Sequence, residues 1–137
     1  MHMMQLLKLI PIPLWHGLLK AILHSIKRYN EAIECYDAAL RINPKDHNAM
    51  NSKAYGLSYM NRNKEALALI NKALEYEPND HKYLDTKGFI LFNLRKYSEA
   101  IKWFDKSLAI DSNYEESLMH KQSMLELEKE KNMARNM

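Results

Sequence analysis

Apolar side chains recur along this chain with the spacing of one face of a helix. Between residues 99 and 110, Ala100, Phe104, Ser107 and Leu108 stand at positions i, i+4, i+7 and i+8, which fall on one side of an α-helix. Equivalent patterns predict further helices over 31–42, 48–60, 65–76 and 82–94. The pattern therefore predicts a succession of short amphipathic helices.

The chain also repeats itself at an offset of 34 residues. Several residue types recur three times at this offset: Glu31, Glu65 and Glu99; Ala32, Ala66 and Ala100; Leu40, Leu74 and Leu108; Lys53, Lys87 and Lys121; Leu57, Leu91 and Leu125. So many coincidences at one offset indicate an internal repeat, and each repeat contains two of the predicted helices.

Proline and aspartate mark the boundaries between repeats. Pro44 and Pro78 follow two of the second helices, and the residue before a proline is pushed out of the α conformation. Asp46 and Asp80 then stand where the next helix needs a capping side chain. Ser112 replaces the expected proline in the third repeat, so that turn is less sharply marked.

These residues resemble the tetratricopeptide repeat family, whose 34-residue unit carries small residues at positions 8, 20 and 27 and proline at position 32. The matches are Ala54 and Gly88 at position 8; Ala32, Ala66 and Ala100 at position 20; Ala39, Ala73 and Ser107 at position 27; Pro44 and Pro78 at position 32. Small side chains let helices pack within about 8–10 Å of each other. The resemblance covers residues 28–131 and implies an all-α, right-handed solenoid of antiparallel helix pairs.

The repeat register predicts a single domain. Its parts are an N-terminal extension (1–12), repeat 1 (13–46), repeat 2 (47–80), repeat 3 (81–114), a C-terminal capping helix (115–131) and a frayed tail (132–137). Repeat 1 has an imperfect first helix, because Lys20 stands where a small residue is expected. A capping helix is predicted because Leu118 and Leu125 keep the phase of a first helix, after which the segment becomes polar.

Composition narrows the class of protein further. The chain has no valine and one threonine, which argues against a β-sandwich or barrel. The net charge of +3 is spread along the sequence, so we expect no nucleic-acid partner. Polar residues and prolines interrupt the apolar segment 3–26, so we expect no membrane span and no signal peptide. The single cysteine, Cys35, predicts a buried structural thiol and a cytoplasmic protein.

No constellation of residues predicts catalysis. The six histidines form no metal-binding motif, and the three glycines form no phosphate-binding loop. His47 and His81 hold equivalent repeat positions and are expected at helix starts, too far apart to share a metal. We therefore expect a non-enzyme with no cofactor and no metal.

The resemblance implies that first helices line a concave groove through repeat positions 2, 5, 9, 12 and 13. The candidate peptide-contacting residues are Asn48, Asn51, Tyr55, Ser58, Tyr59, Lys82, Asp85, Phe89, Phe92, Asn93, Glu116, Met119 and Ser123. The mixture of aromatic and amide side chains suits an extended or helical peptide. For Phe89 and Phe92 the alternative is packing between repeats.

The expected function is therefore a protein-interaction module that holds a peptide segment of a partner protein. One branch of the family clamps the terminal carboxylates of chaperones with Lys, Asn and Arg. Here Thr86, Gly17 and Ala21 stand at three of those positions, which disfavours a chaperone tail. The alternative function is a self-associating structural unit, a homodimer through an exposed N-terminal or terminal-helix surface.

Overall fold

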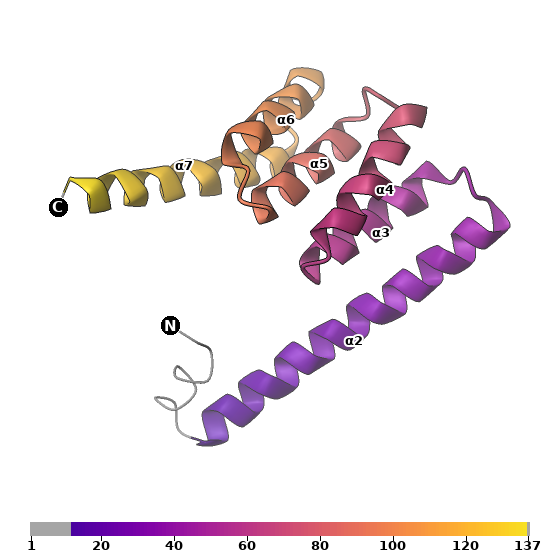
Figure 1. Ribbon diagram of the computed structural model, residues 1–137, viewed down its shortest axis with the longest axis horizontal. Coiled ribbons are helices and arrows are strands. Elements are labelled where there is room, and N and C mark those ends of the chain that lie inside the picture. The colour runs from indigo at the N-terminus through magenta and orange to yellow at the C-terminus, as the bar shows by residue number, and fades with distance from the viewer. Residues whose placement is uncertain (1–11, 137) are drawn as a thin grey trace.

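The computed structural model describes residues 12–136, and within them it contains helices and no strand. The helices are α2 (Ile12–Ile42), α3 (His47–Tyr59), α4 (Asn63–Tyr76), α5 (His81–Asn93), α6 (Tyr97–Ile110) and α7 (Glu115–Arg135). Figure 1 shows α3 to α6 stacked as two antiparallel pairs, with α2 and α7 extending from the two ends. The predicted all-α solenoid is confirmed.

The predicted stop and start signals act as expected. Helices α2 and α4 end at Ile42 and Tyr76, two residues before Pro44 and Pro78. The Asp46 carboxylate then accepts a hydrogen bond from the backbone N–H of Ala49 (3.1 Å). The Asp80 carboxylate accepts bonds from the N–H groups of Lys82 (2.9 Å) and Tyr83 (3.4 Å). Each aspartate satisfies donors that the first turn of a helix leaves free.

Within each pair, the turn between helices uses a left-handed residue. Asn61 has a φ of 63° and Arg95 a φ of 62°. They are 34 residues apart and occupy the same repeat position. The left-handed conformation ends α3 and α5 and turns the chain back in an antiparallel direction.

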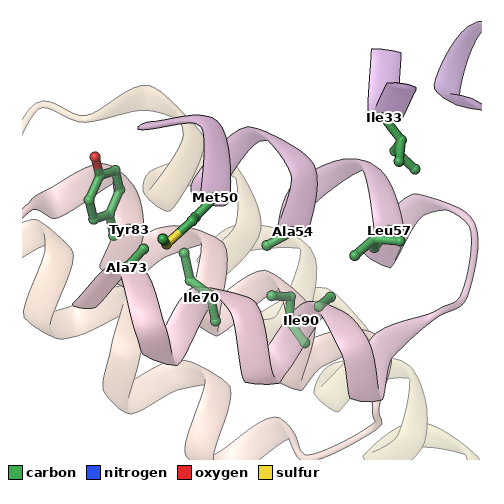
Figure 2. Packing of buried hydrophobic residues seen from close by; sticks show 9 residues of the cluster. Ile33, Met50, Ala54, Leu57, Ile70, Ala73, Tyr83 and Ile90 are labelled. Atoms are coloured by element: carbon green, nitrogen blue, oxygen red, sulfur yellow. The ribbon is translucent and has the colours of Figure 1, made fainter. Parts of the chain in front are cut away.

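The core lies between the helix pairs and is built around small residues. Ala54, Ala66 and Ala73 are fully buried, so α3 and α4 approach closely. Figure 2 shows the larger side chains that fill the space around them, which are Ile33, Met50, Leu57, Ile70, Tyr83 and Ile90. A second cluster centres on Phe104 and joins α5, α6 and α7.

Helix α2 departs from the predicted arrangement of repeat 1. The sequence predicts a second helix beginning at Glu31, but α2 is one continuous helix of 31 residues. Lys27 holds the repeat position of Asn61 and Arg95, yet it lies inside the helix. No proline or glycine between residues 18 and 42 interrupts the helix, and no tightly packed partner forces a turn there.

Two further expectations differ from the structure. Helix α7 continues to Arg135, four residues past the predicted end of the capping helix. Cys35 is exposed, so the prediction of a buried thiol is wrong. It lies on a side of α2 that no other described helix covers, which the repeat pattern alone does not reveal.

Tyr83 joins two repeats through its phenol group. The hydroxyl donates to Asn48 Oδ1 (2.7 Å), so it accepts from His47 Nδ1 (2.6 Å), because a phenol has one proton to give. Burial raises the pKa of Tyr83 to about 12. The folded state therefore favours the neutral phenol.

Tyr83→Phe is expected to lower the free energy of unfolding by about 1 kcal/mol at neutral pH, because two hydrogen bonds are lost. A pKa raised in the folded state stabilises the protein below the ordinary tyrosine pKa of 10.0, and this contribution is lost as pH rises towards about 12. Denaturant unfolding of both proteins across this range checks the prediction. A difference between wild type and variant that does not shrink with rising pH would contradict it.

Candidate functional site

Helices α3, α5 and α7 are the first helices of successive repeats and lie next to one another. Their common surface carries a hollow of about 300 Å³. Its lining residues are Tyr36, Asn51, Ser52, Tyr55, Lys82, Asp85, Thr86, Tyr114 and Glu116. We call this feature the α3–α5–α7 hollow. Five of the residues proposed from sequence line it, namely Asn51, Tyr55, Lys82, Asp85 and Glu116.

A row of rings crosses the same surface from α3 to α7. Tyr55 stacks on Phe89 with ring centroids 4.7 Å apart, and Tyr59 lies 5.0 Å from Tyr55. Phe89 in turn lies 5.1 Å from the His120 ring. Tyr59 is exposed, Tyr55 is half-buried and Phe89 is buried. The row therefore both packs the repeats together and presents aromatic surface to solvent.

The Asp85 carboxylate contacts His120 at the end of this row and is only 2% exposed. Its Oδ1 accepts from Ser117 Oγ (2.7 Å) and lies 3.1 Å from His120 Nδ1. Ser117 Oγ is also 2.9 Å from Ser107 Oγ, which donates to the carbonyl of His81 (2.7 Å). A buried carboxylate is tolerated only with such partners, so Asp85 joins α5 to α7.

Polar groups suited to a peptide gather around the hollow. Lys82 is exposed and carries a positive charge. The Asn51 amide oxygen is buried and has no hydrogen-bond partner among the described residues, so it can accept from a ligand N–H after a small side-chain movement. The Thr86 hydroxyl is already used, because it donates to the Lys82 carbonyl (3.0 Å).

Two of the three phenols of the hollow, those of Tyr55 and Tyr114, have raised pKa values. Burial, together with the neighbouring Tyr59 hydroxyl, raises the pKa of Tyr55. Burial, together with the Glu116 carboxylate, raises the pKa of Tyr114. Both groups therefore stay protonated under ordinary conditions. Tyr114 can donate to a peptide carbonyl only when its proton is released from Glu116.

The other residues proposed from sequence lie elsewhere. Ser58 and Asn93 belong to a hydrogen-bonded set at the hairpin turns, where Asn93 donates to Ser58 (2.8 Å) and Ser58 donates to Asn63 (2.7 Å). Phe92 packs on Tyr97. Asn48 accepts from Tyr83, whereas Met119 and Ser123 are exposed on α7. Whether any of these residues contacts a peptide stays a prediction.

Sequence reasoning missed four residues of the hollow, which are Tyr36, Ser52, Thr86 and Tyr114. Tyr36 holds the repeat position of the buried Ile70 and Phe104, which pointed to the core. Tyr114 precedes α7 and corresponds in the repeat to the capping residues Asp46 and Asp80. Only its aromatic side chain distinguished it from those residues and could have indicated a place in the hollow.

Two other kinds of site are absent from the part of the chain that the structure describes. No three His, Cys, Asp or Glu side chains within residues 12–136 gather as metal ligands do. No helix within the same range is both long and apolar enough to cross a membrane.

Stacked antiparallel helix pairs with a 34-residue period, whose first helices share one surface, define a tetratricopeptide repeat protein. The family described as Anaphase-promoting complex, cyclosome, subunit 3 matches residues 25–107, which is more than half of the chain. The chain belongs to this family.

Solved structures show the same fold. The first TPR of Spaghetti (RPAP3), bound to the HSP90 peptide SRMEEVD, is 22% identical and covers 74% of this chain and 80% of its own, with a TM-score of 0.66. The first TPR domain of human RPAP3 is 22% identical, with coverage of 77% and 84% and a TM-score of 0.68. The Sgt2 TPR domain from Aspergillus fumigatus is 21% identical, with coverage of 78% and 72% and a TM-score of 0.67. Curated protein sequences contain no significant match to this chain.

Proposed function

We propose that this chain is a non-catalytic interaction module that holds a short peptide segment of a partner protein in the α3–α5–α7 hollow. The observation that carries the proposal is the convergence of five sequence-predicted residues on one hollow from α3, α5 and α7, the first helices of successive repeats. Extended peptides need both apolar contacts and hydrogen-bond partners for their backbone. Tyr55 and Tyr114 supply rings and phenol donors, and Asn51 supplies an acceptor without a partner.

Charge indicates which peptides suit the hollow. Lys82 and Glu116 both line the hollow, so a segment that carries an acidic and a basic group is favoured. Two solved relatives are bound to chaperone peptides, one of HSP90 and one of HSP70. Here Thr86 is buried with its hydroxyl committed to a backbone carbonyl. A second cation is therefore missing from that position, and a chaperone tail remains disfavoured.

The test is selection of a peptide by the purified chain from a displayed random library, followed by titration of the synthetic peptide. Lys82→Glu is expected to weaken binding about tenfold or more, because an attraction in the hollow becomes a repulsion. Its fold should be unaffected, since Lys82 is exposed in the first turn of α5, where negative charge is favourable.

Lys72→Glu is the matched control, because it makes the same charge change at an exposed position of α4 outside the hollow. It is expected to bind like wild type. Equal binding by Lys82→Glu and Lys72→Glu, or failure of the library to yield any specific peptide, would rule out the hollow as the binding site.

A further inference from the structure

Helix α2 leaves uncovered a set of positions that the other repeats bury. Ala32, Tyr36 and Ala39 are half-exposed. The residues at the same repeat positions are fully buried, namely Ala66, Ile70 and Ala73 in α4 and Ala100, Phe104 and Ser107 in α6. In those repeats the preceding antiparallel helix covers them. In repeat 1 the corresponding segment does not fold back on these positions. It forms the first part of the single continuous helix α2.

The straight part of α2, residues 17–28, is here called the α2 arm. Its Leu23 is 56% exposed, whereas Leu57 and Leu91 at the same repeat position are 1% and 3% exposed. Leu19, Ile22 and Ile26 are also exposed. An arm with several exposed aliphatic side chains is a surface that gains free energy when it is covered.

The arm is poorly suited to fold back on its own chain as the other first helices do. Such a hairpin needs a small residue at position 8 of the repeat. In repeat 3 this residue is Gly88, and a Cβ atom added to it would lie 2.5 Å from the Phe104 ring. In repeat 1, Lys20 stands at the position of Gly88 and Tyr36 at the position of Phe104. A long side chain in that place does not fit the spacing that a short connecting turn imposes.

A heptad pattern runs along one side of α2 through both the arm and the uncovered positions. Ile22, Ser25, Tyr29, Ala32, Tyr36 and Ala39 follow one another at alternating intervals of three and four residues, which is the spacing of a two-helix coiled-coil seam. We call these six residues the α2 seam. None is charged and none is fully buried. Tyr36 also lines the α3–α5–α7 hollow, so a second helix packed on the seam borders that hollow.

The space beside the seam accommodates side chains of such a helix. A hollow of about 530 Å³ lies between the arm and the end of α3. It is lined by Ala21, Ile22, Ser25, Ile26, Tyr29, Tyr59, Met60 and Asn61. Tyr29 lies in the middle of the seam and stacks on Tyr59 with centroids 5.1 Å apart.

Charge indicates what the second helix is. The arm carries Lys20, Lys27 and Arg28 and no acidic residue, whereas residues 29–42 carry three acidic residues, Glu31, Glu34 and Asp37, against one basic residue, Arg41. An antiparallel copy of α2 places the basic arm of each chain beside the acidic half of the other. A parallel copy places like charges together.

We propose that two copies of this chain form a twofold-symmetric dimer in which their α2 helices pack antiparallel along the α2 seam. The twofold axis passes near Tyr29, which brings Ile22 of each copy opposite Tyr36 of the other and Ser25 opposite Ala32. The partner's arm then covers the positions that repeat 1 leaves open. With the axis near Tyr29, residues 16–42 of the two α2 helices overlap, which is a length of about 40 Å.

The test is the molar mass of the full chain, measured by light scattering or sedimentation equilibrium over a wide concentration range. Wild type is expected to reach twice 16.2 kDa. Ile22→Glu is expected to weaken association at least about 100-fold, because symmetry buries the new charge twice. Leu23→Glu is the matched control. It is an adjacent exposed aliphatic residue of the arm that lies off the seam, and it is expected to stay dimeric.

Circular dichroism checks that both variants keep the wild-type helix content. A monomeric wild type would overturn the proposal, and so would a mass that keeps rising with concentration, which indicates open-ended association. The proposal would also be overturned if Leu23→Glu were monomeric and Ile22→Glu remained dimeric. The dimer contact would then lie on the side of the arm that carries Leu23, and not on the α2 seam.

Direction is tested by disulfide formation in a Cys35→Ser background. A mixture of chains carrying Ser25→Cys with chains carrying Ala32→Cys is expected to cross-link between the two kinds of chain. Ser25→Cys alone should cross-link poorly, since the two copies of residue 25 lie about two helical turns apart in an antiparallel pair. Efficient cross-linking of Ser25→Cys alone indicates parallel helices and contradicts the proposal.

Discussion

Gly88→Leu is expected to lower the free energy of unfolding by about 3 kcal/mol. A Cβ atom built on Gly88 lies 2.5 Å from Cε1 and 2.6 Å from Cδ1 of Phe104, well inside van der Waals contact. The ring has little room to move, because Phe104 is fully buried and stacks on His120 with centroids 5.2 Å apart. A larger side chain must therefore separate α5 from α6, which costs packing over the whole interface. Denaturant unfolding followed by far-UV circular dichroism measures the change.

The two core glycines provide a matched comparison. A Cβ atom on Gly56 meets its nearest neighbour, Ile33, at 3.7 Å, so Gly56→Ala is expected to stabilise the protein by about 0.5–1 kcal/mol through helix propensity alone. Gly88→Ala gains the same propensity but is expected to be destabilising. If both substitutions stabilise equally, the close packing of α5 against Phe104 does not hold.

Asp85→Ala is expected to cost about 2–3 kcal/mol of stability. The substitution removes the acceptor that Ser117 and His120 share and leaves both groups without a partner in a buried place. Because these residues lie on α7, its packing against α5 should loosen first. Hydrogen exchange of the α7 amides, together with the denaturation midpoint, measures the effect.

Asp105→Ala is the control for Asp85→Ala. Asp105 pairs with Lys121 at 2.7 Å, and solvent reaches both side chains, which are 51% and 36% exposed, so its loss should change stability by about 0.5 kcal/mol or less. Asp85→Asn retains an acceptor oxygen and is expected to fall between the two. Equal stability of Asp85→Ala and Asp105→Ala would show that the buried network contributes nothing.

The boundaries of repeats 2 and 3 were predictable because local chemistry decides them. Pro44, Pro78, Asp46 and Asp80 act within a few residues of their own positions, so no knowledge of tertiary contacts was needed. The alanines of α3 and α4 were also predictable as core, since close helix packing demands small residues wherever the repeat places them.

The unbroken course of α2 was not predictable in the same way. The turn at Arg95 is held by packing of the helices on either side, because arginine, unlike the asparagine at position 61, has no preference for a left-handed conformation. The presence of Lys27 at the equivalent position therefore did not indicate that the turn would be absent from repeat 1. The roles of Asp85 and Phe89 were equally hidden, since a repeat position says which helix face a residue occupies and not how deeply its neighbours cover it.

The burial of Phe89 also decides which residue is best substituted to test binding in the α3–α5–α7 hollow. Phe89 is only 8% exposed and touches three other rings, so its truncation would disturb the stacking of repeats as well as any ligand contact. An exposed residue such as Lys82 separates the two effects, which is why it carries the binding test.

The stacking described for α3 to α7 also has a kinetic consequence. Each of these helices contacts the next one along the chain, and beyond that α3 contacts α5 and α5 contacts α7. Contacts between residues close in sequence need little loop closure before they form, so the domain should fold rapidly for its size. Its central hairpins, which have neighbours on both sides, should form the folding nucleus, and structure should then spread outward to α7 and to the unpaired end of α2.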